Sequence, residues 1–192
     1  MSIWYYNDNA EKFFNDTHKL DMQDIYNKFI PHLPKGGKIL DAGCGSGRDI
    51  KKFSELGYDA IGFDASKDMV KRANSLTNGK VLHLHFEEIN WINEFDGIWA
   101  CASLLHVPEK NFKSVGTKLY KSLKINCPFY LSFKYGYREY VKDNRFFQCH
   151  DEKSLENLMK SIGSFSKQEF WQTTDIRPDR KKEKWLNAIY IK

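Results

Sequence analysis

The first part of the chain alternates apolar and polar residues with the period of a helix. The apolar residues that recur at this spacing are Ala10, Phe13, Phe14, Met22, Ile25, Tyr26 and Phe29. Such spacing gathers apolar side chains on one face of an amphipathic helix. Pro31 and Pro34 end the second run because proline cannot continue a helix. The pattern therefore predicts two helices within residues 9–30, ahead of the first strand.

From residue 38 onward, short apolar runs alternate with amphipathic stretches. The apolar runs predict strands at 38–42, 59–63, 81–85, 95–102 and 129–133, and the amphipathic stretches predict helices at 49–56, 67–75 and 111–123. Strands that alternate with helices in this way form a mostly parallel sheet with helices on both faces. The middle of the chain is therefore predicted to be the core of an α/β fold.

The last part of the chain departs from this alternation. An irregular stretch, 135–150, comes before a predicted helix at 154–162 and two predicted strands at 166–173 and 185–191. A charged turn joins these strands, so we expect them to close the sheet as a hairpin whose last strand is antiparallel to its neighbour. The prediction for the whole chain is a Rossmann-like, doubly wound, seven-stranded and mostly parallel sheet with an antiparallel last strand.

Length and composition bear on the domain organisation. With 192 residues, 41% of them hydrophobic, the chain can bury one core but hardly two. No repeat, low-complexity tract or flexible linker interrupts it. The sheet and its helices use most of the length, so the walls of a substrate pocket must come from short additions. We therefore predict a single domain over residues 1–192, with an N-terminal helical lid at 1–34 and a Rossmann-like core at 35–192.

Charge and cysteine usage narrow the class of partner. The formal net charge of +5 and the pI of 8.9 are mildly basic, which is weaker than the basic face of a dedicated nucleic-acid binder. The 4 cysteines are widely spaced without a CxxC pair, as expected for free thiols in a reducing cytoplasm. No apolar run approaches the roughly 20 residues that cross a bilayer, and the start lacks a signal-peptide pattern. We expect a cytoplasmic protein without a membrane partner.

The strongest local signal is a glycine-rich turn that follows the first predicted strand. Residues 39–49 run from an apolar strand through Gly43, Gly45 and Gly47 into a helix. Glycines let the backbone turn tightly beside a ligand, and the helix start offers free N–H groups. About 20 residues later the second strand ends at Asp64, where a carboxylate can accept both hydroxyls of a ribose. Together, the turn and Asp64 predict a site for an adenosine-type ligand.

Two residues argue against a dinucleotide at this turn. A dinucleotide-binding turn has its third glycine three residues after the second, where this chain has Arg48. A bulky cation there does not suit the close helix packing of a pyrophosphate site. Asp41, two residues before the first glycine, suits a ligand with a positively charged amino group better than a diphosphate. The turn therefore favours a nucleoside that carries an amino acid over a dinucleotide.

These features resemble a known family. Residues 38–66 resemble motifs I and II of the class I S-adenosylmethionine (SAM)-dependent methyltransferases, and residues 95–108 resemble their strand-four motif. The whole chain is similar to the compact bacterial methyltransferases grouped with the tellurite-resistance and thiopurine enzymes. The resemblance implies an enzyme with SAM as its cofactor. The residues that it implies at the cofactor are Tyr6, Thr17, Met22, Asp41, Gly43, Gly45, Gly47, Arg48, Asp64, Ala65, Ser66, Met69, Ala102 and Ser103.

The chain departs from the family pattern at two places. After the third strand, where an acidic residue often binds the adenine amino group, the sequence reads His83-Leu84-His85-Phe86-Glu87-Glu88. We assign the adenine edge to Phe86 and Glu87. The usual Pro-Gly-Gly turn before the fifth strand is replaced by residues 125–128, a change that touches no chemistry we can name.

Methyl transfer from a sulfonium needs orientation more than chemical groups, with a base only where the acceptor must lose a proton. His106, just after the fourth strand, is the candidate base because its ordinary pKa lies near neutrality, and the alternative is that it orders the 105–108 loop. His83 and His85 lie on one strand face without a third ligand nearby, so no metal site is expected. Cys127 lies in a turn away from the expected methyl position and is interpreted as structural.

The identity of the methyl acceptor is open at this stage. Aromatic clusters near residues 4–14 and 135–147 can sandwich a flat or soft small molecule, so we expect a small-molecule acceptor. The basic residues within the second cluster also leave a nucleic-acid acceptor such as RNA possible, though not favoured. A protein methyltransferase and a non-catalytic SAM-binding module are further alternatives. The sequence fits a monomer or a homodimer equally well.

Overall fold

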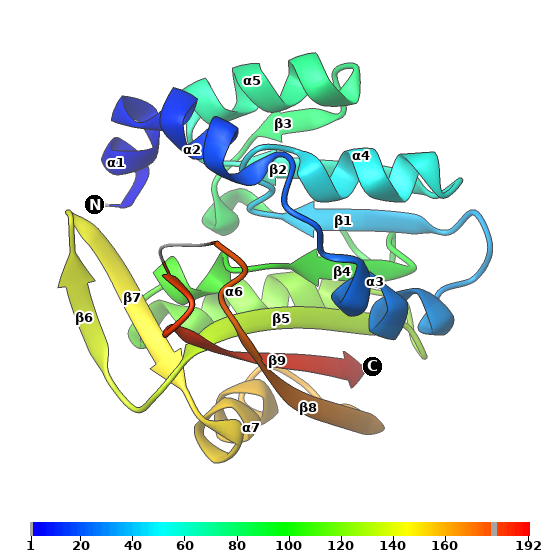
Figure 1. The fold of residues 1–192 in the computed structure, drawn as a ribbon. Coiled ribbons are helices and arrows are strands. Elements are labelled where there is room, and N and C mark those ends of the chain that lie inside the picture. The colour runs from blue at the N-terminus through cyan, green and yellow to red at the C-terminus, as the bar shows by residue number, and fades with distance from the viewer. Residues whose placement is uncertain (1, 178–179) are drawn as a thin grey trace.

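A single twisted sheet organises the molecule (Figure 1). The computed structural model describes residues 2–177 and 180–192. Its central strands run in the order β3-β2-β1-β4-β5, all parallel, and β9 joins β5 antiparallel, with β8 outside it. This order confirms the predicted Rossmann-like fold and its antiparallel last strand. The bounds of these strands are β1 (Lys38–Ala42), β2 (Asp59–Asp64), β3 (Val81–His83), β4 (Gly97–Ala100), β5 (Pro128–Tyr135), β8 (Lys167–Thr174) and β9 (Lys184–Ile191).

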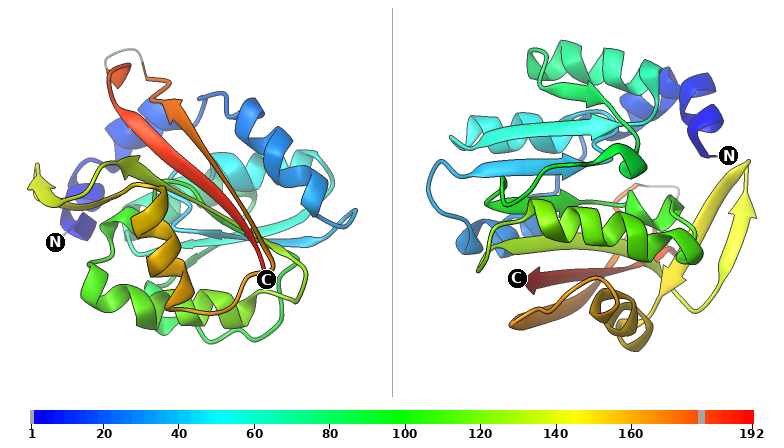
Figure 2. Two further views of the ribbon diagram at one scale, coloured as in Figure 1. Left: turned by 90° about the horizontal axis from the view of Figure 1, so that it is seen from below. Right: turned by 180° about the vertical axis from the view of Figure 1, so that it is seen from behind.

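Helices cover both faces of the sheet (Figure 2). On one face, α6 (Glu109–Ser122) and α7 (Glu152–Lys160) close a core that contains Phe112 and Phe133. On the other face, α3 (Gln23–Phe29), α4 (Arg48–Glu55) and α5 (Lys67–Thr77) close a second core around Trp99. Trp99 is fully buried and stacks on Tyr130 with ring centroids 4.0 Å apart. The parallel strands are thus buried on both sides, which explains why their sequences read as continuous apolar runs.

Within residues 2–177 and 180–192, the sheet has nine strands rather than the predicted seven. The extra two are β6 (Glu139–Lys142) and β7 (Arg145–His150), which form a hairpin in the stretch expected to be irregular. Strand β7 is buried on both faces, with Phe147 and Cys149 on one and Gln148 and His150 on the other. Because buried positions on the second face carry polar residues, the sequence does not show the apolar run expected of a buried strand. The signal that could have found it is the turn at Asp143 and Asn144, whose φ angles of 50° and 56° are typical of a two-residue hairpin.

The N-terminal segment also holds one helix more than predicted. Helix α1 (Ser2–Asp8) precedes α2 (Ala10–Thr17), so three α-helices come before β1. Helix α1 has no buried residue, and its seven residues are too few for a periodic signal. It is fixed by contacts of its rings: Tyr6 packs edge-on against Phe13 of α2, with ring centroids 5.0 Å apart. Helices α1 and α2 lie beside α5 at the carboxyl ends of the parallel strands (Figure 1).

Candidate active site

A cavity of about 790 Å³ opens at the carboxyl ends of the parallel strands. Its walls come from the loops after β1, β2 and β4, from α1 and α2, and from β5, β8 and β9. Most of the residues predicted at the cofactor line it. They are Tyr6, Thr17, Met22, Asp41, Gly43, Gly45, Arg48, Asp64, Ala65, Ser66, Phe86, Glu87, Ala102 and Ser103, and the candidate base His106 lines it as well.

Two predicted residues, Gly47 and Met69, do not line the cavity. Gly47 precedes α4 with a φ of 77°, and a Cβ there would stand 2.9 Å from the Thr77 side chain of α5. This glycine therefore serves the packing of α4 against α5. Met69 is 1% exposed within α5, and only its backbone N–H reaches towards the site, donating to Ser66 Oγ at 3.2 Å. Both residues support the cavity from behind.

The glycine turn is shaped by close backbone approach. Gly43 has a φ of 77°, and a Cβ there would come within 2.6 Å of the Ser103 Cβ. Ser103 is held in place because its hydroxyl donates to the Ala42 carbonyl at 2.6 Å. Next to it, Ala102 also has a positive φ, 52°, which ends β4 earlier than the sequence predicted. The loops after β1 and β4 therefore fit together only with glycine at position 43.

Asp64 connects the end of β2 to the glycine turn. Its Oδ2 accepts from the Gly45 N–H at 3.0 Å, and its Oδ1 accepts from the Ser66 N–H at 2.9 Å. Burial raises the pKa of this carboxyl, against the lowering effect of those two backbone bonds. Each carboxylate oxygen can accept more than one hydrogen bond, so Asp64 retains capacity for hydroxyl groups in the cavity.

Asp41 is a buried carboxyl with an oxygen that lacks a partner. It is 1% exposed, and its Oδ2 makes no hydrogen bond with any described residue. Burial raises the pKa of Asp41 well above its ordinary value, and the nearby charge of Asp49 raises it further. An unpartnered buried carboxylate costs free energy unless a cation or donor reaches it. The site is therefore electrostatically prepared for a positively charged group beside Asp41.

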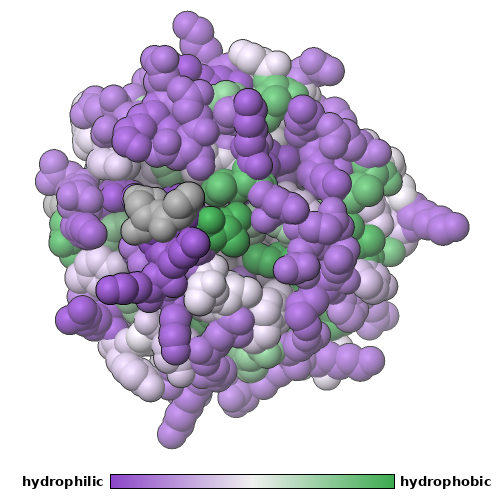
Figure 3. All heavy atoms as spheres, in the orientation of Figure 1, coloured by the Kyte–Doolittle hydropathy of each residue, from purple (hydrophilic) through white to green (hydrophobic). Residues whose placement is uncertain are grey.

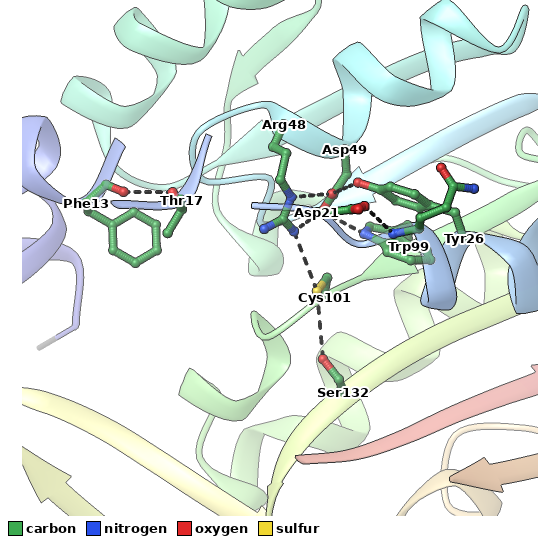
Figure 4. Close-up of polar contacts among 10 residues, drawn as sticks. Phe13, Thr17, Asp21, Tyr26, Arg48, Asp49, Trp99, Cys101 and Ser132 are labelled. Carbon is green, nitrogen blue, oxygen red and sulfur yellow. Dashed lines mark hydrogen bonds and ion pairs between the residues drawn. The ribbon is translucent and has the colours of Figure 1, made fainter. Parts of the chain in front are cut away.

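Asp49, by contrast, is fully paired (Figure 4). It accepts from Arg48 Nε at 2.7 Å, Arg48 Nη2 at 2.8 Å and Trp99 Nε1 at 2.9 Å, and also from the Tyr26 hydroxyl. Burial alone would raise the pKa of Asp49, but the Arg48 charge and these donors lower it. The arrangement fixes the Arg48 guanidinium over the cavity, with Nη2 at 3.9 Å from Cys101 Sγ. Nη1 makes no bond to another described residue.

His106 lies between two fixed groups. Its Nδ1 is 2.6 Å from the Phe146 carbonyl oxygen and its Nε2 is 2.8 Å from the Tyr6 hydroxyl. Because a carbonyl only accepts, Nδ1 donates and Nε2 accepts the Tyr6 proton. Burial lowers the pKa of His106 to about 4 and raises that of Tyr6 to about 12. In this arrangement both ring nitrogens are engaged, and His106 ties α1 to β7.

The remaining candidates lie apart from the centre of the site. His83 Nε2 is 3.1 Å from the Ala65 carbonyl, and its ring is 6.0 Å from that of His85. Within residues 2–177 and 180–192, no group of three or more His, Cys, Asp or Glu side chains is arranged to hold a metal ion. Cys127 does not line the cavity. No helix in the same ranges is long and apolar enough to cross a membrane.

Sequence reasoning missed a second set of cavity residues. They come from β5, β8, β9 and the segment after β8, and they include Tyr130, Ser132, Thr173, Asp175, Trp185 and Asn187. These positions carry no motif, and they meet only through the register of antiparallel strands. Figure 3 shows apolar side chains gathered at the centre of the face that Figure 1 presents, inside a polar rim.

Comparison with known proteins identifies a methyltransferase domain within the chain. The family model of the methyltransferase domain matches residues 39–126, from β1 to the turn before β5. Residues 39–126 thus carry a methyltransferase domain, in agreement with the resemblance of the sequence to the class I SAM-dependent methyltransferases. A putative methyltransferase of Bacillus subtilis, YqeM, is 32% identical over 105 residues, which are 48% of this chain and 42% of that protein. The matched part thus spans about two fifths of that relative's length.

Solved methyltransferase structures share the fold over nearly the whole chain. The 1,6-didemethyltoxoflavin-N1-methyltransferase of Burkholderia thailandensis superposes with a TM-score of 0.74 at 18% identity, covering 99% of this chain and 85% of that one. That structure contains 1,6-didemethyltoxoflavin and S-adenosylhomocysteine. A TehB-like SAM-dependent methyltransferase of Corynebacterium glutamicum gives a TM-score of 0.70 at 18% identity, covering 98% of each chain. At this identity the likeness establishes the fold.

Proposed function

We propose that this methyltransferase transfers the methyl group of SAM to a small-molecule acceptor within the cavity. The observation that carries the proposal is the unpartnered Oδ2 of Asp41, a carboxylate oxygen with no donor among the described residues. SAM carries an ammonium, a carboxylate and a ribose, so its binding site needs an anion, a cation and a hydroxyl acceptor. Asp41, Arg48 and Asp64 line one cavity and supply these three.

Each group has a role that follows from its bonds. Asp41 would accept from the ammonium, and Arg48 would offer its uncommitted Nη1 to the carboxylate while Asp49 holds the rest of its guanidinium. Asp64 would accept from the ribose hydroxyls. The loops that hold Ala65, Ser66, Phe86 and Glu87 would enclose the adenine, and Ala102 and Ser103 would border the methionine portion. Bound SAM supplies an electrophilic methyl group, and the chain orients it and excludes water.

A small acceptor suits the dimensions of the site. A cavity of about 790 Å³ lies within the range of roughly 300–1,000 Å³ typical of small-molecule sites, so cofactor and a compact acceptor fill it. The Burkholderia neighbour holds a small acceptor together with the demethylated cofactor, which supports the same class here. A cytoplasmic location is part of the proposal, since all the cysteines carry free thiols.

We further propose that the N-terminal helices act as a lid over the cofactor. Among the described residues, three side-chain hydrogen bonds tie α1 to the core: Tyr6 to His106 at 2.8 Å, Ser66 Oγ to Asn7 Oδ1 at 2.6 Å, and the Phe146 N–H to Ser2 Oγ at 3.1 Å. So few bonds allow local opening without unfolding of the sheet. Hydrogen exchange should show residues 2–17 poorly protected in the free protein and slower with SAM bound. Equal protection in both states would identify a fixed wall.

The test of the cofactor assignment is calorimetry with SAM and S-adenosylhomocysteine (SAH). We expect binding of both, and SAH release when small acceptors are supplied. Removal of residues 1–16 should abolish transfer while leaving a folded core. Absence of binding in the intact chain would overturn the proposal, and salt-sensitive transfer to RNA would replace the small acceptor by a polymer.

A further inference from the structure

The part of the cavity beyond Cys101 has a floor made by three adjacent strands. We call it the acceptor lobe and define it by Tyr130, Ser132, Thr173, Trp185 and Asn187, all of which line the cavity. In the strand register Ser132 lies opposite Asn187, and Trp185 lies opposite Thr173. Side chains at these alternate positions share the sheet face that α3 covers. The floor therefore runs continuously from β5 across β9 to β8.

The lobe adjoins the proposed cofactor site. Cys101 Sγ lies 3.9 Å from Arg48 Nη2 and 4.0 Å from Ser132 Oγ, so one sulfur bridges the two parts of the cavity. Figure 4 shows Arg48, Cys101 and Ser132 in line between α4 and β5. A molecule on this floor lies next to the end of β4, where the resemblance places the methionine portion of the cofactor. The lobe is thus the part of the cavity left for an acceptor.

Hydrogen bonds within the floor leave the Thr173 hydroxyl as a donor. Asn187 is held at both ends of its amide, accepting from the Tyr130 hydroxyl at 2.8 Å and donating to Thr173 Oγ1 at 3.0 Å. Ser132 Oγ accepts from the Ala102 N–H at 2.8 Å and donates to Cys101 Sγ at 4.0 Å. Because Thr173 Oγ1 already accepts a bond from Asn187, its proton is the part left for a ligand among the described residues. The floor therefore suits a ligand that presents hydrogen-bond acceptors.

The charged groups around the lobe are paired. Asp175, 4% exposed, accepts from Arg177 Nε at 2.9 Å and from Trp185 Nε1 at 3.1 Å. Burial would raise the pKa of Asp175, but the bonds and charge of Arg177 lower it. Asp49 is paired with Arg48 in the same way. With both carboxylates paired, the lobe has no open anion for a cationic acceptor.

No group in the lobe is placed to take a proton from an acceptor. Both nitrogens of His106 are engaged, and burial raises the pKa of Cys101 to about 12. Asp41 and Asp64 face the proposed cofactor, while His85 and Glu87 follow β3 on the far side of β1 from the lobe. Asp21 and Asp24 are exposed at the rim. Among the described cavity residues, none serves as a base beside the acceptor.

We propose that the acceptor lobe binds an uncharged heteroaromatic molecule and that a ring nitrogen with a free lone pair is the atom methylated. The inference rests on the proposed SAM-dependent function. Thr173 would donate to a ring nitrogen or carbonyl of the acceptor, and the ring of Trp185 offers a packing surface. The nitrogen lone pair forms the new N–CH₃ bond as the S–CH₃ electron pair returns to sulfur. The cationic product can lose a ring N–H proton to water, so no protein base is needed.

The test is an SAH-release assay with benzimidazole and lumazine as ring-nitrogen probes and with catechol, phenethylamine and 2-mercaptoethanol as contrasting probes. We expect release with at least one ring-nitrogen probe and none above background with the others. Preference for catechol, the amine or the thiol would overturn the proposal. So would the absence of transfer to both ring-nitrogen probes in a protein that binds SAH. A protein that does not bind SAH would overturn both this proposal and the cofactor assignment.

Variants at β8 test the location. Thr173→Trp should fill the lobe and lower turnover at least about tenfold while the Kd for SAH changes by less than about threefold. Gln172→Trp is the matched control, since Gln172 is the exposed neighbour outside the cavity, and its turnover should match that of the unmodified protein. Thr173→Val keeps the shape and removes the donor, so KM for the probe should rise about three- to tenfold. Unchanged KM and turnover in both Thr173 variants would overturn the location.

Discussion

The two parts of the cavity differ in how their charges are satisfied. In the cofactor part, Asp41 has an oxygen without a donor, and Arg48 keeps Nη1 uncommitted. In the acceptor lobe, the amide of Asn187 is bonded at both ends, and beside the lobe Asp175 is paired with Arg177. A buried charge without a partner is costly, whereas a paired one is tolerated. The contrast indicates that one part awaits a charged ligand and the other an uncharged one.

The largest expected effect concerns the border between the two parts. Asp49→Ala leaves Arg48 buried without its carboxylate and frees the Tyr26 and Trp99 donors. Removing one partner of a buried ion pair costs about 3–5 kcal/mol, so urea unfolding should show a loss of that size. A free energy of unfolding equal to that of the unmodified chain would contradict this contrast, because Asp49 would then not anchor Arg48.

The next effect lies within the cofactor part. Asp64→Ala removes the acceptor proposed for the ribose and also the bonds to the Gly45 and Ser66 N–H groups. Charge-assisted bonds contribute about 1.5–3 kcal/mol each, so the Kd for SAM should rise by about 100-fold. Asp59→Ala, an exposed position at the other end of β2, is the matched control. Calorimetry that finds the same affinity in both variants would remove Asp64 from the site.

The same contrast explains what could be predicted from sequence. The cofactor part is built from short contiguous segments, so the apolar strand pattern, the glycine-rich turn and Asp64 predicted it from the sequence. The acceptor lobe depends on the Ser132 to Asn187 register, and the Tyr6 to His106 bond joins residues 100 positions apart. No local pattern encodes such distant pairings. Helix α1 and the β6–β7 hairpin were not predicted for a related reason: tertiary contacts stabilise them, and their sequences show no periodic apolar pattern.

A smaller effect is expected at the bond that ties the N-terminal helices to the core. The pKa of His106 is about 4 in the folded chain, against about 6.5 when unfolded. Between these values the unfolded state binds more protons, so the contribution of His106 to stability falls as pH drops from about 6.5 to 4. His106→Asn removes that titration. When the pH falls from about 6.5 to 4, the free energy of unfolding of the variant should therefore decrease by about 1–3 kcal/mol less than that of the unmodified chain.

Urea unfolding at pH 7 and at pH 4.5 measures the difference between the two proteins. Using the difference removes the contributions of the carboxyls, which are common to both proteins. Parallel pH profiles would show that the His106 ring is exposed to water in the folded chain. A fall in turnover by a factor of about 10²–10⁴ on substitution would instead identify His106 as a base. The acceptor could then also be a group that must lose a proton before it is methylated.

The smallest effect is also the most specific, because its two measurements should move in opposite directions. Asp41→Asn removes the buried charge whose Oδ2 has no donor. Burial raises the pKa of this carboxyl, so at pH 7 the group opposes folding, and the amide should raise the free energy of unfolding by about 1 kcal/mol. The same change removes the proposed partner of the SAM ammonium, and the Kd for SAM should rise by about tenfold. If Asp41 had only a structural role, the substitution would lower the free energy of unfolding and leave the Kd for SAM unchanged.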